Sequence, residues 1–400
     1  MALTRETVVT PAVVVGSGLG ALGALRLLRR SGIPTFSVPA VPSHESRSRW
    51  AQRLPGSGAT LASASLPEIL AACSLEQAAL IPCSDAVLSA IAQLPEPLSR
   101  RFPSSTPPAQ AVASLTRKDH FAVLLDALDV PRPTTLIIDD PRDLERFADL
   151  PFTHLFLKPV DSASFMRSYG VKACRVRDMN DARAQLAKVT GDGHRVVVQE
   201  YVAGPGSNHY LIDGFIDAGG TVRALFARRR LRMFPPDFGD STHMVSVPLS
   251  EVAPAVESLR AVLAAVGYRG IFSGEFKQDE RDGLFKILEV NARVWIYVEF
   301  AGRCGVDVCT MSYRDALGLP VTAPAHYRTG VRLVSPYLDL AAVRYAWRRG
   351  EMSAGAWLRS WAGAQQPAFN LSDPVPAIAD WVDVSRKLLR SAWRGGPAEP

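Results

Sequence analysis

Residues Gly274 to Lys277 read Gly-Glu-Phe-Lys, and after a turn within Asp279 to Gly283 the chain continues from Ile287 to Arg293 as Ile-Leu-Glu-Val-Asn-Ala-Arg. Two short runs of alternating polar and apolar residues around such a turn predict a β-hairpin. If the turn is symmetric, Glu275 on the first strand lies directly opposite Glu289 on the second. Paired Cβ atoms lie about 5 Å apart, and two carboxylates so placed destabilise a hairpin unless a cation lies between them.

The second strand of this hairpin adds two polar side chains to Glu289. Side chains alternate between the faces of a strand, so Glu289, Asn291 and Arg293 share one face. Two carboxylates and an amide oxygen suit Mg²⁺, which prefers carboxylate, phosphate and water oxygens to nitrogen or sulfur. Arg293 would then neutralise charge that develops on a transferred phosphoryl or acyl group. The alternative is a solvated hairpin with an incidental charged face.

Two lysines that precede the hairpin favour the metal-site interpretation. Lys118 lies within Thr-Arg-Lys-Asp, and Lys158 lies within Phe-Leu-Lys-Pro. Either lysine alone would be an ordinary surface residue. As an ordered pair they resemble the two nucleotide lysines of the ATP-grasp superfamily, and that resemblance implies contacts with the α- and β-phosphates of ATP.

The hairpin itself carries the more specific part of this resemblance. Glu275, followed by Glu289-x-Asn291-x-Arg293, resembles the metal and catalytic signature of the ATP-grasp superfamily. The resemblance implies that Glu275, Glu289 and Asn291 bind Mg²⁺, with Mn²⁺ as an alternative ion, and that Arg293 is catalytic. It extends over about residues 10 to 315.

The stretch that ends at Val202 resembles the hinge between the two ATP-grasp subdomains. In this family Glu200 and the backbone around Tyr201 and Val202 would contact the adenine ring. The alternative is a half-buried strand end. Near the ribose many members of the family place an acid, whereas this chain has Asn208 and His209, so the role of these two residues stays open.

A phosphate loop is expected between Lys158 and the hinge, where the family has a glycine-rich flap. Residues Asp161 to Gly170 contain one glycine and three serines, which departs from the family pattern. Serine hydroxyls and backbone amides still bind phosphate. We therefore take Ser168 and Gly170 as the candidate phosphate contacts in this loop.

Three arginines alternate along a predicted strand that precedes Phe234. Arg228, Arg230 and Arg232 would share one face, where they could line a pocket for phosphate and a substrate carboxylate. A solvated edge strand, whose charges discourage aggregation, is the alternative. Of the three, Arg230 is our candidate for a nucleotide contact.

The glycines near the N-terminus match a loose dinucleotide fingerprint. Gly16, Gly18 and Gly20 follow a predicted strand and open a predicted helix. The fingerprint also requires an acid about twenty residues later to bind the ribose, but the second strand ends without one and the next acid is Glu45. We therefore do not expect NAD. The segment resembles instead the N-terminal domain of carboxylate-amine ligases, D-aspartate-ligase-like members of the superfamily among them.

The predicted fold class is α/β and α+β. A Rossmann-like (pre-ATP-grasp) domain over residues 1–110 is followed by ATP-grasp subdomain 1 over 111–205, subdomain 2 over 206–330, and a helical extension rich in Trp and Arg over 331–400. Prolines 95 to 108 would form the first linker, and Thr116 with Asp119 would start the next helix as a capping box. Further predicted elements are strands Ala12–Val15, Thr35–Val38, Ala79–Pro82, Thr135–Ile138 and Val196–Tyr201, and a helix Asp85–Gln93.

Composition excludes several classes of protein. Five scattered cysteines without a CxxC pair predict neither a disulfide framework nor a zinc site. A net charge of +6 over 400 residues gives no support for nucleic-acid binding, and no apolar run is long enough to span a bilayer. We expect a cytoplasmic protein.

The resemblance implies an ATP-dependent carboxylate-amine ligase that forms an amide or peptide bond through an acyl phosphate. Its substrates would be a small carboxylate and an amine, and relatives leave a homodimer open by analogy. The alternative is a catalytically silent ATP-binding sensor or scaffold of the same fold. A further alternative concerns the extension, whose Trp and Arg content fits either a packed helical cap or peripheral docking to a membrane or polymer.

Overall fold

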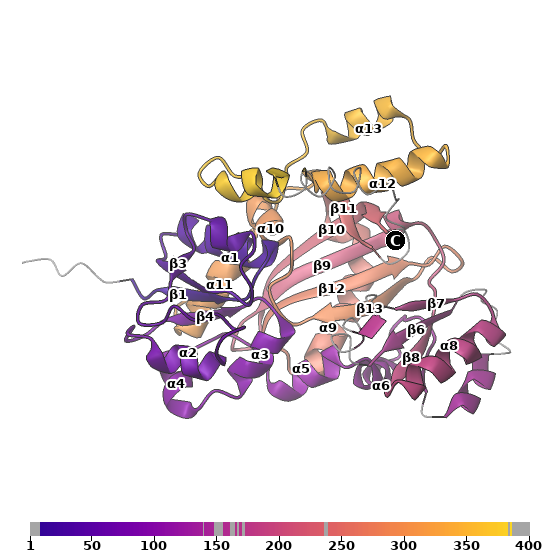
Figure 1. The fold of residues 1–400 in the computed structure, drawn as a ribbon, viewed down its shortest axis with the longest axis horizontal. Coiled ribbons are helices and arrows are strands. Elements are labelled where there is room, and N and C mark those ends of the chain that lie inside the picture. The colour runs from indigo at the N-terminus through magenta and orange to yellow at the C-terminus, as the bar shows by residue number, and fades with distance from the viewer. Residues whose placement is uncertain are drawn as a thin grey trace, which may run out of the picture.

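The computed structural model describes residues 9–138, 140–147, 155–160, 165, 168–169, 173–235, 239–382 and 385. Within them the strands form three sheets, two of four strands and one of six. The six-stranded sheet lies at the centre of the molecule, with the N-terminal sheet on one side and the other four-stranded sheet at the far end (Figure 1). No helix in the described ranges is long and apolar enough to cross a membrane.

The N-terminal sheet is parallel, as the predicted Rossmann-like arrangement requires. Its order is β3-β2-β1-β4. Strands β1 and β4 consist only of buried residues, which is typical of parallel strands that are covered on both faces. The elements are β1 (Ala12–Val15), α1 (Leu19–Arg30), β2 (Thr35–Val38), β3 (Gln52–Arg53), α2 (Leu66–Ala72), β4 (Ala79–Pro82) and α3 (Asp85–Ala92).

The proline-rich segment is more helical than we predicted. Helix α4 (Glu96–Arg101) lies inside it, and α5 (Ala109–Thr116) begins at its end. Pro95 and Pro108 are the N-cap residues of these helices, where a missing backbone N–H costs nothing. These prolines therefore start helices, and only the residues between α4 and α5 form a linker.

The predicted capping box at Thr116 is wrong. Thr116 is the last residue of α5, and its hydroxyl donates to the Val112 carbonyl at 2.8 Å. Arg117 caps the next helix, α6 (Lys118–Leu128), and its guanidinium donates to Asp119 at 2.8 Å. Because α5 continues to Thr116, the Thr116 hydroxyl bonds within α5 and does not cap the N-terminus of α6. Lys118 nevertheless lies in the first turn of α6, as predicted.

The second four-stranded sheet is antiparallel and has the order β5-β8-β6-β7. Its apolar face packs on α8 (Met179–Gly191) through Ala182, Leu186 and Val189, which are all buried. The strands are β5 (Thr135–Ile138), β6 (Leu155–Pro159), β7 (Cys174–Val176) and β8 (Val196–Glu200), and η2 (Pro141–Phe147) is a 3₁₀ segment.

The central sheet is antiparallel, with the order β13-β12-β9-β10-β11-β14. One face is largely apolar and packs on α5, α6 and α9 through residues such as Ile212, Phe272 and Val290. The strands and the covering helix are β9 (His209–Ile216), β10 (Val222–Phe234), β11 (Asp240–Val247), α9 (Ala253–Ala265), β12 (Gly270–Gln278), β13 (Phe285–Asn291) and β14 (Arg332–Val334).

The other face of the central sheet is divided between apolar and polar side chains. Phe215, Phe226 and Ile271 pack on α1, α10 (Val298–Cys304) and α11 (Val308–Ala316), and this core joins the central sheet to the N-terminal domain. Beyond them on neighbouring strands the same face carries Asp213 and Glu275. The apolar half thus supports a polar half that faces the small antiparallel sheet.

We predicted that the C-terminal segment is helical. The structure shows that it also contains a strand. It begins with β14, which adds an edge strand to the central sheet, and continues into α12 (Pro336–Arg348) and α13 (Ala354–Trp361). Trp357 packs edge-on against both Trp347 and Trp361, with ring centroids 5.7 and 5.0 Å away. The three tryptophans therefore form a cluster of their own.

Candidate nucleotide and metal site

The two hairpin carboxylates lie directly opposite each other, as predicted, but a bulge and not a symmetric turn gives this register. Glu275 pairs with Glu289, and Gly274 pairs with Val290 in the same register. Nearer the turn the register shifts by one residue, so that Phe276 faces Ile287. This bulge adds a residue to β13, and it keeps Phe276 and Ile287 in the core while both carboxylates stay on the polar face.

Two groups from neighbouring strands approach Glu275. Arg230 on β10 is buried, and its Nη2 donates to Glu275 Oε1 at 3.2 Å while its Nε donates to Ser241 Oγ at 2.8 Å. His209 Nε2 lies 3.8 Å from the same carboxylate oxygen. Burial lowers the pKa of His209 well below its usual value, and Arg230 and Lys277 lower it further, so the ring is neutral at pH 7. Arg230 is therefore the charged partner of Glu275.

Glu289, Asn291 and Arg293 form a chain of hydrogen bonds, which confirms that they share one face. Asn291 Nδ2 donates to Glu289 Oε1 at 3.0 Å, and Arg293 Nη2 donates to Asn291 Oδ1 at 3.3 Å. Arg293 Nε also donates to Asp85 Oδ1 at 3.1 Å. Asp85 is the first residue of α3, so the predicted catalytic arginine is held from both the central sheet and the N-terminal domain.

Asp85 is a residue of this site that our sequence analysis placed only as the start of a helix. It follows the apolar strand β4, and Ser84 caps its helix by accepting from Val87 N. Its position beyond the carboxyl end of a parallel strand is where ligands commonly bind in such sheets. That signal could have marked Asp85 as a candidate, although it does not identify Arg293 as its partner.

The two predicted lysines reach the same space from the other side. Lys158 on β6 is half-buried, and its Nζ donates to Gln199 Oε1 at 2.6 Å. Burial lowers the pKa of Lys158; Glu289 opposes this shift, Lys118 adds to it, and Glu275 opposes it. Lys158 therefore interacts electrostatically with each of the other three groups. The lysines, Arg230 and Arg293 outnumber the carboxylates near them, which favours an anionic ligand.

Glu200 of the predicted hinge forms hydrogen bonds with other residues of the protein. Glu200 is buried, accepts from Thr134 N at 3.1 Å, and also accepts a short hydrogen bond from the Arg281 guanidinium. Arg281 belongs to the turn between β12 and β13, so this ion pair ties the hairpin to the end of β8. Sequence reasoning missed Arg281, because its partner lies 81 residues away.

The other two hinge residues pack between the sheets. The Tyr201 ring lies edge-on to Phe156 with centroids 5.3 Å apart, and Lys277 Nζ lies 4.0 Å from the centre of the same ring. Val202 is buried. Lys277, on β12, is a fully buried lysine. We did not predict it as a residue of the site, because only Glu275 of this strand matched the family signature.

The predicted phosphate loop is described only in part. Gly170 and most of the residues between Lys158 and Cys174 lie outside the described ranges. Ser168 is exposed, and its hydroxyl lies 3.2 Å from His194 Nε2. No contact between described residues links Ser168 to the hairpin carboxylates, so its predicted role stays a prediction.

Only one of the three alternating arginines reaches the hairpin carboxylates. Arg228 pairs with Asp213 at 2.7 Å, and Arg232 pairs with Asp339 of α12 at 2.7 Å. The pairing of β10 with β11 shifts on both sides of Arg232, which directs this side chain to the C-terminal segment. Arg228 and Arg230 therefore share the polar face as predicted, whereas Arg232 does not; the contact of Arg230 with a nucleotide stays a prediction.

The N-terminal glycine turn holds a carboxylate of this chain. Gly18 precedes α1, and its backbone N–H donates to Glu45 Oε2 at 2.7 Å and to Ser43 Oγ at 2.9 Å. Glu45 is fully buried. The N-terminus of a helix is where a dinucleotide would place its pyrophosphate, and Glu45 occupies this position. This contact argues against the dinucleotide interpretation of the glycines.

The donor set at the hairpin suits a metal ion that is shared with a ligand. Among the described residues no group of three or more His, Cys, Asp or Glu side chains is arranged to hold a metal. The hairpin offers two carboxylates and an amide, and Mg²⁺ commonly completes such a set with phosphate oxygens and water. The residues present therefore fit Mg²⁺ bound together with a nucleotide, and they do not form a closed protein site.

Comparison with known proteins finds one curated protein that is similar in sequence and many solved structures that are similar in fold. No protein-family model matches the chain. It is 25% identical over 224 residues to a D-aspartate ligase from Enterococcus faecium (strain Aus0004), and the match covers 54% of this chain and 52% of that ligase. The similarity thus spans about half the length of the curated relative.

Two solved structures show the same fold at low sequence identity. An N5-carboxyaminoimidazole ribonucleotide synthetase in its ADP complex has a TM-score of 0.61 at 10% identity, covering 86% of this chain and 87% of that one. An L-amino acid ligase from Bacillus licheniformis has a TM-score of 0.56 at 16% identity, covering 78% and 75%. The chain therefore has the ATP-grasp fold, and in sequence it is similar to a D-aspartate ligase.

Proposed function

We propose that this protein is an ATP-dependent carboxylate-amine ligase that forms an amide bond through an acyl phosphate. The observation that carries the proposal is the facing pair Glu275 and Glu289, with Asn291 beside it and Arg230 and Lys158 close to its carboxylates. Facing carboxylates destabilise a hairpin unless cations lie near them, and these cations together with Mg²⁺ would also attract the phosphates of a nucleotide. The similarity to a D-aspartate ligase supports the same conclusion.

ATP would bind between the small antiparallel sheet and the central sheet. Lys118 and Lys158 would contact its phosphates, and the hinge at Tyr201 and Val202 would lie at its adenine. Glu275, Glu289 and Asn291 would hold Mg²⁺, which neutralises phosphate charge in phosphoryl transfer. The buried Glu200, already bonded to Arg281, would fix the hinge rather than move to the ligand.

The reaction would proceed in two steps. A carboxylate oxygen forms a bond to the γ-phosphorus while the bond to ADP breaks, and ADP leaves. The amine nitrogen then attacks the acyl carbon, inorganic phosphate leaves, and the amine proton passes to a base or to water. Arg293 lies beside Asn291 and would neutralise charge on the acyl phosphate and on the tetrahedral intermediate. Closure of the site would protect the acyl phosphate from water.

A coupled ADP-release screen tests this proposal. Amino acids and small dicarboxylates are offered with a panel of amines, and the product is identified by mass spectrometry. We expect ADP release that needs both substrates, and acyl hydroxamate when hydroxylamine replaces the amine. ATP binding without ADP release for any pair would instead favour a silent sensor.

Arg293→Ala separates chemistry from binding. We expect this variant to lose carboxylate-dependent ADP release while MgATP still binds. Arg260→Ala is the matched control, because Arg260 is an exposed arginine on α9, on the other face of the central sheet. Undiminished turnover in Arg293→Ala would refute the role of Arg293.

A further inference from the structure

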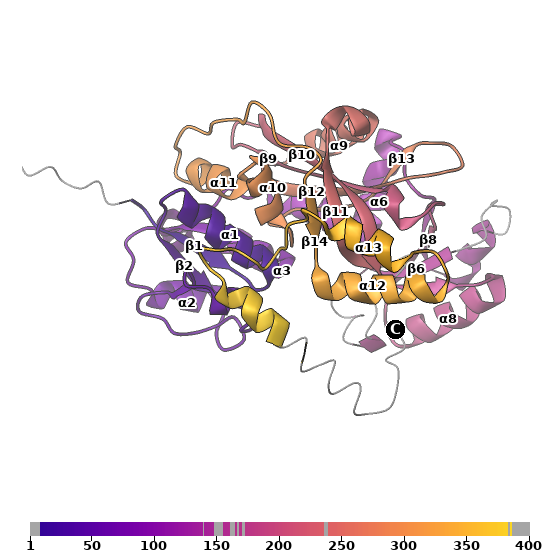
Figure 2. The same ribbon diagram turned by 90° about the horizontal axis from the view of Figure 1, so that it is seen from above.

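The C-terminal segment forms a layer along one side of the molecule. Helices α12 and α13 and the helical residues 375–382 lie together along the top edge in Figure 1, and Figure 2 shows them facing the viewer from above. This layer extends from the N-terminal domain to the central sheet. It contributes no residue to the hairpin site.

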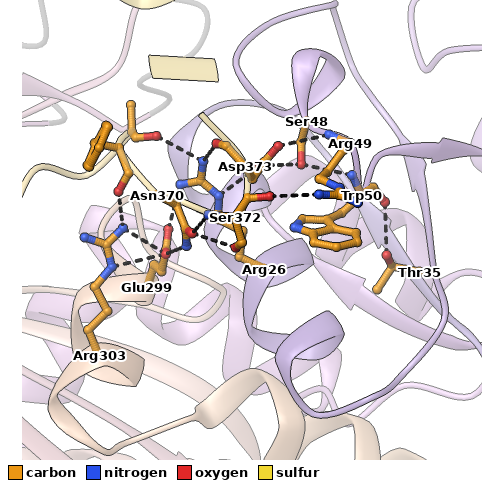
Figure 3. A network of polar contacts seen from close by, with 12 residues as sticks. Arg26, Thr35, Ser48, Arg49, Trp50, Glu299, Arg303, Asn370, Ser372 and Asp373 are labelled. Carbon is orange, nitrogen blue, oxygen red and sulfur yellow. Dashed lines mark hydrogen bonds and ion pairs between the residues drawn. The ribbon is translucent and has the colours of Figure 1, made fainter. Parts of the chain in front are cut away.

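Two buried carboxylates attach the inner side of this layer. Asp339 of α12 is fully buried, and it accepts from Arg232 Nε at 2.8 Å and from Trp361 Nε1 at 2.6 Å. Asp373 is also fully buried, and it accepts from Arg26 Nε at 3.0 Å and from Ser48 Oγ at 2.7 Å (Figure 3). One attachment is to the central sheet and the other to the N-terminal domain, so the layer is held at both ends.

The outer side of the layer is apolar in regular stripes. On α12 the exposed residues Tyr337, Leu340 and Trp347 follow helical spacing, whereas Ala342 and Val343 are buried. Helix α13 has no buried residue, although its sequence is amphipathic. Along the layer the exposed fractions are 40% for Leu340, 39% for Trp347, 62% for Leu358, 60% for Ile378 and 50% for Trp381.

Arginines without acidic partners lie among these apolar residues. Arg344 and Arg348 of α12 and Arg359 of α13 are exposed, and none forms an ion pair within the described part of the chain. Arg344 lies between Leu340 and Trp347 on the same stripe. Leu, Ile and Trp side chains beside Arg are typical of helices that lie in the interface of an anionic bilayer.

A second copy of this chain is a poorer occupant for the layer. A two-fold dimer brings the same surface patch of both copies together. Arg344, Arg348 and Arg359, which have no acidic partner among the described residues, would then face arginines, and like charges across an interface cost affinity. Anionic lipid headgroups neutralise these arginines while the acyl region covers the apolar side chains.

We propose that the layer formed by α12, α13 and residues 375–382 is a docking surface for an anionic lipid bilayer. The buried attachments at Asp339 and Asp373 hold it in a fixed orientation to the rest of the protein. Leu358, Ile378 and Trp381 enter the headgroup region, and Arg344 and Arg359 contact lipid phosphates. This docking is independent of the ligase activity proposed above.

Co-sedimentation with vesicles tests the docking surface. The full chain is mixed with vesicles of phosphatidylcholine and phosphatidylglycerol, and with vesicles of phosphatidylcholine alone. We expect binding to the first that weakens as salt is raised, and little binding to the second. Leu358→Glu combined with Ile378→Glu should weaken partition at least about tenfold, because two apolar side chains are replaced by charges in the interface.

The matched control carries the same substitutions elsewhere. Val123 and Leu319 are also exposed, at 58% and 42%, and lie on α6 and after α11. Val123→Glu combined with Leu319→Glu should bind vesicles as the wild type does, and urea unfolding should show that both double variants are folded. Equal binding by all three proteins, or no binding by the wild type, overturns the proposal. So does a dimer that Leu358→Glu with Ile378→Glu dissociates in the absence of vesicle binding.

Discussion

Removal of the Asp339 carboxylate should release the C-terminal layer from the central sheet. Asp339 is fully buried and receives hydrogen bonds from Arg232, Thr242 and Trp361. The Arg232 side chain is only 14% exposed, so Asp339→Ala leaves a nearly buried cation without its partner. Breaking a buried ion pair from one side costs about 3–5 kcal/mol.

The cost should appear as local opening, because α12 can detach while the central sheet stays folded. About 3–5 kcal/mol corresponds to roughly 10²- to 5 × 10³-fold faster exchange of amides whose protection needs a docked α12. Hydrogen exchange measured by mass spectrometry on peptides from α12 and α13 gives this number directly. Peptides from α2 serve as the internal reference, since the buried residues of α2 lie in a core of the N-terminal domain that contains no residue of the C-terminal layer.

Two companion variants separate charge from packing. Asp339→Asn keeps the shape and one acceptor, and we expect a smaller acceleration than in Asp339→Ala. Arg232→Met combined with Asp339→Leu removes both charges, and it should restore much of the protection, as apolar replacement of a buried pair often does. Acceleration of less than tenfold in Asp339→Ala would refute the anchoring role of Asp339.

Three further predictions concern the site and the pH dependence of stability. Lys158→Met should weaken MgATP binding about tenfold or more in a calorimetric titration, because it removes a cation from beside the phosphates, whereas the exposed Lys188→Met should not. Asp85→Asn should lower kcat/KM for the carboxylate on the order of tenfold with MgATP affinity unchanged, since it removes the charged partner of Arg293; an equal loss for both ligands would contradict this. Burial, and next Arg232, lowers the pKa of His243 from 6.5 to about 4, so below pH 6.5 the unfolded chain binds a proton that the folded chain does not. The unfolding free energy should therefore fall by about 2 kcal/mol between pH 7 and pH 5, and His243→Leu should flatten this slope in urea titrations; an unchanged slope would contradict the assignment.

The hairpin site was predictable because its residues are close together in the sequence. Glu275 and Glu289 are joined by a short turn, and alternation along one strand places Asn291 and Arg293 beside the second carboxylate. The bulge that follows Glu275 was not predictable, since an extra residue in the strand and a longer turn give the same sequence. The predicted register at the carboxylates was correct because the bulge lies on the turn side of them.

Contacts between distant segments could not be predicted from pattern alone. Asp85 lies 208 residues from Arg293, and Asp373 lies 347 residues from Arg26. Each of these residues has an ordinary local explanation: Asp85 opens a helix, and Asp373 precedes a proline. Their function as partners of buried or half-buried arginines appears only when tertiary packing brings the segments together.

The glycine turn shows a case in which the local pattern was correct and its usual ligand was not. A strand, the glycines and a helix are all present. The carboxylate of Glu45 takes the anion position at the start of α1. An internal carboxylate at this position cannot be distinguished from a bound phosphate by spacing alone, because both satisfy the same backbone N–H groups.

The most direct test of the proposed site is a calorimetric titration of a non-hydrolysable ATP analogue, with Mg²⁺ and with EDTA, into the wild type and into Glu289→Gln. We predict that the wild type binds the analogue at least about tenfold more tightly with Mg²⁺. Glu289→Gln should lose most of this difference, because one of two facing carboxylates is gone. Glu257→Gln on α9 is the matched control. Equal binding in Mg²⁺ and EDTA by the wild type, or an undiminished Mg²⁺ effect in Glu289→Gln, would contradict the central claim that the facing carboxylates hold the metal of MgATP.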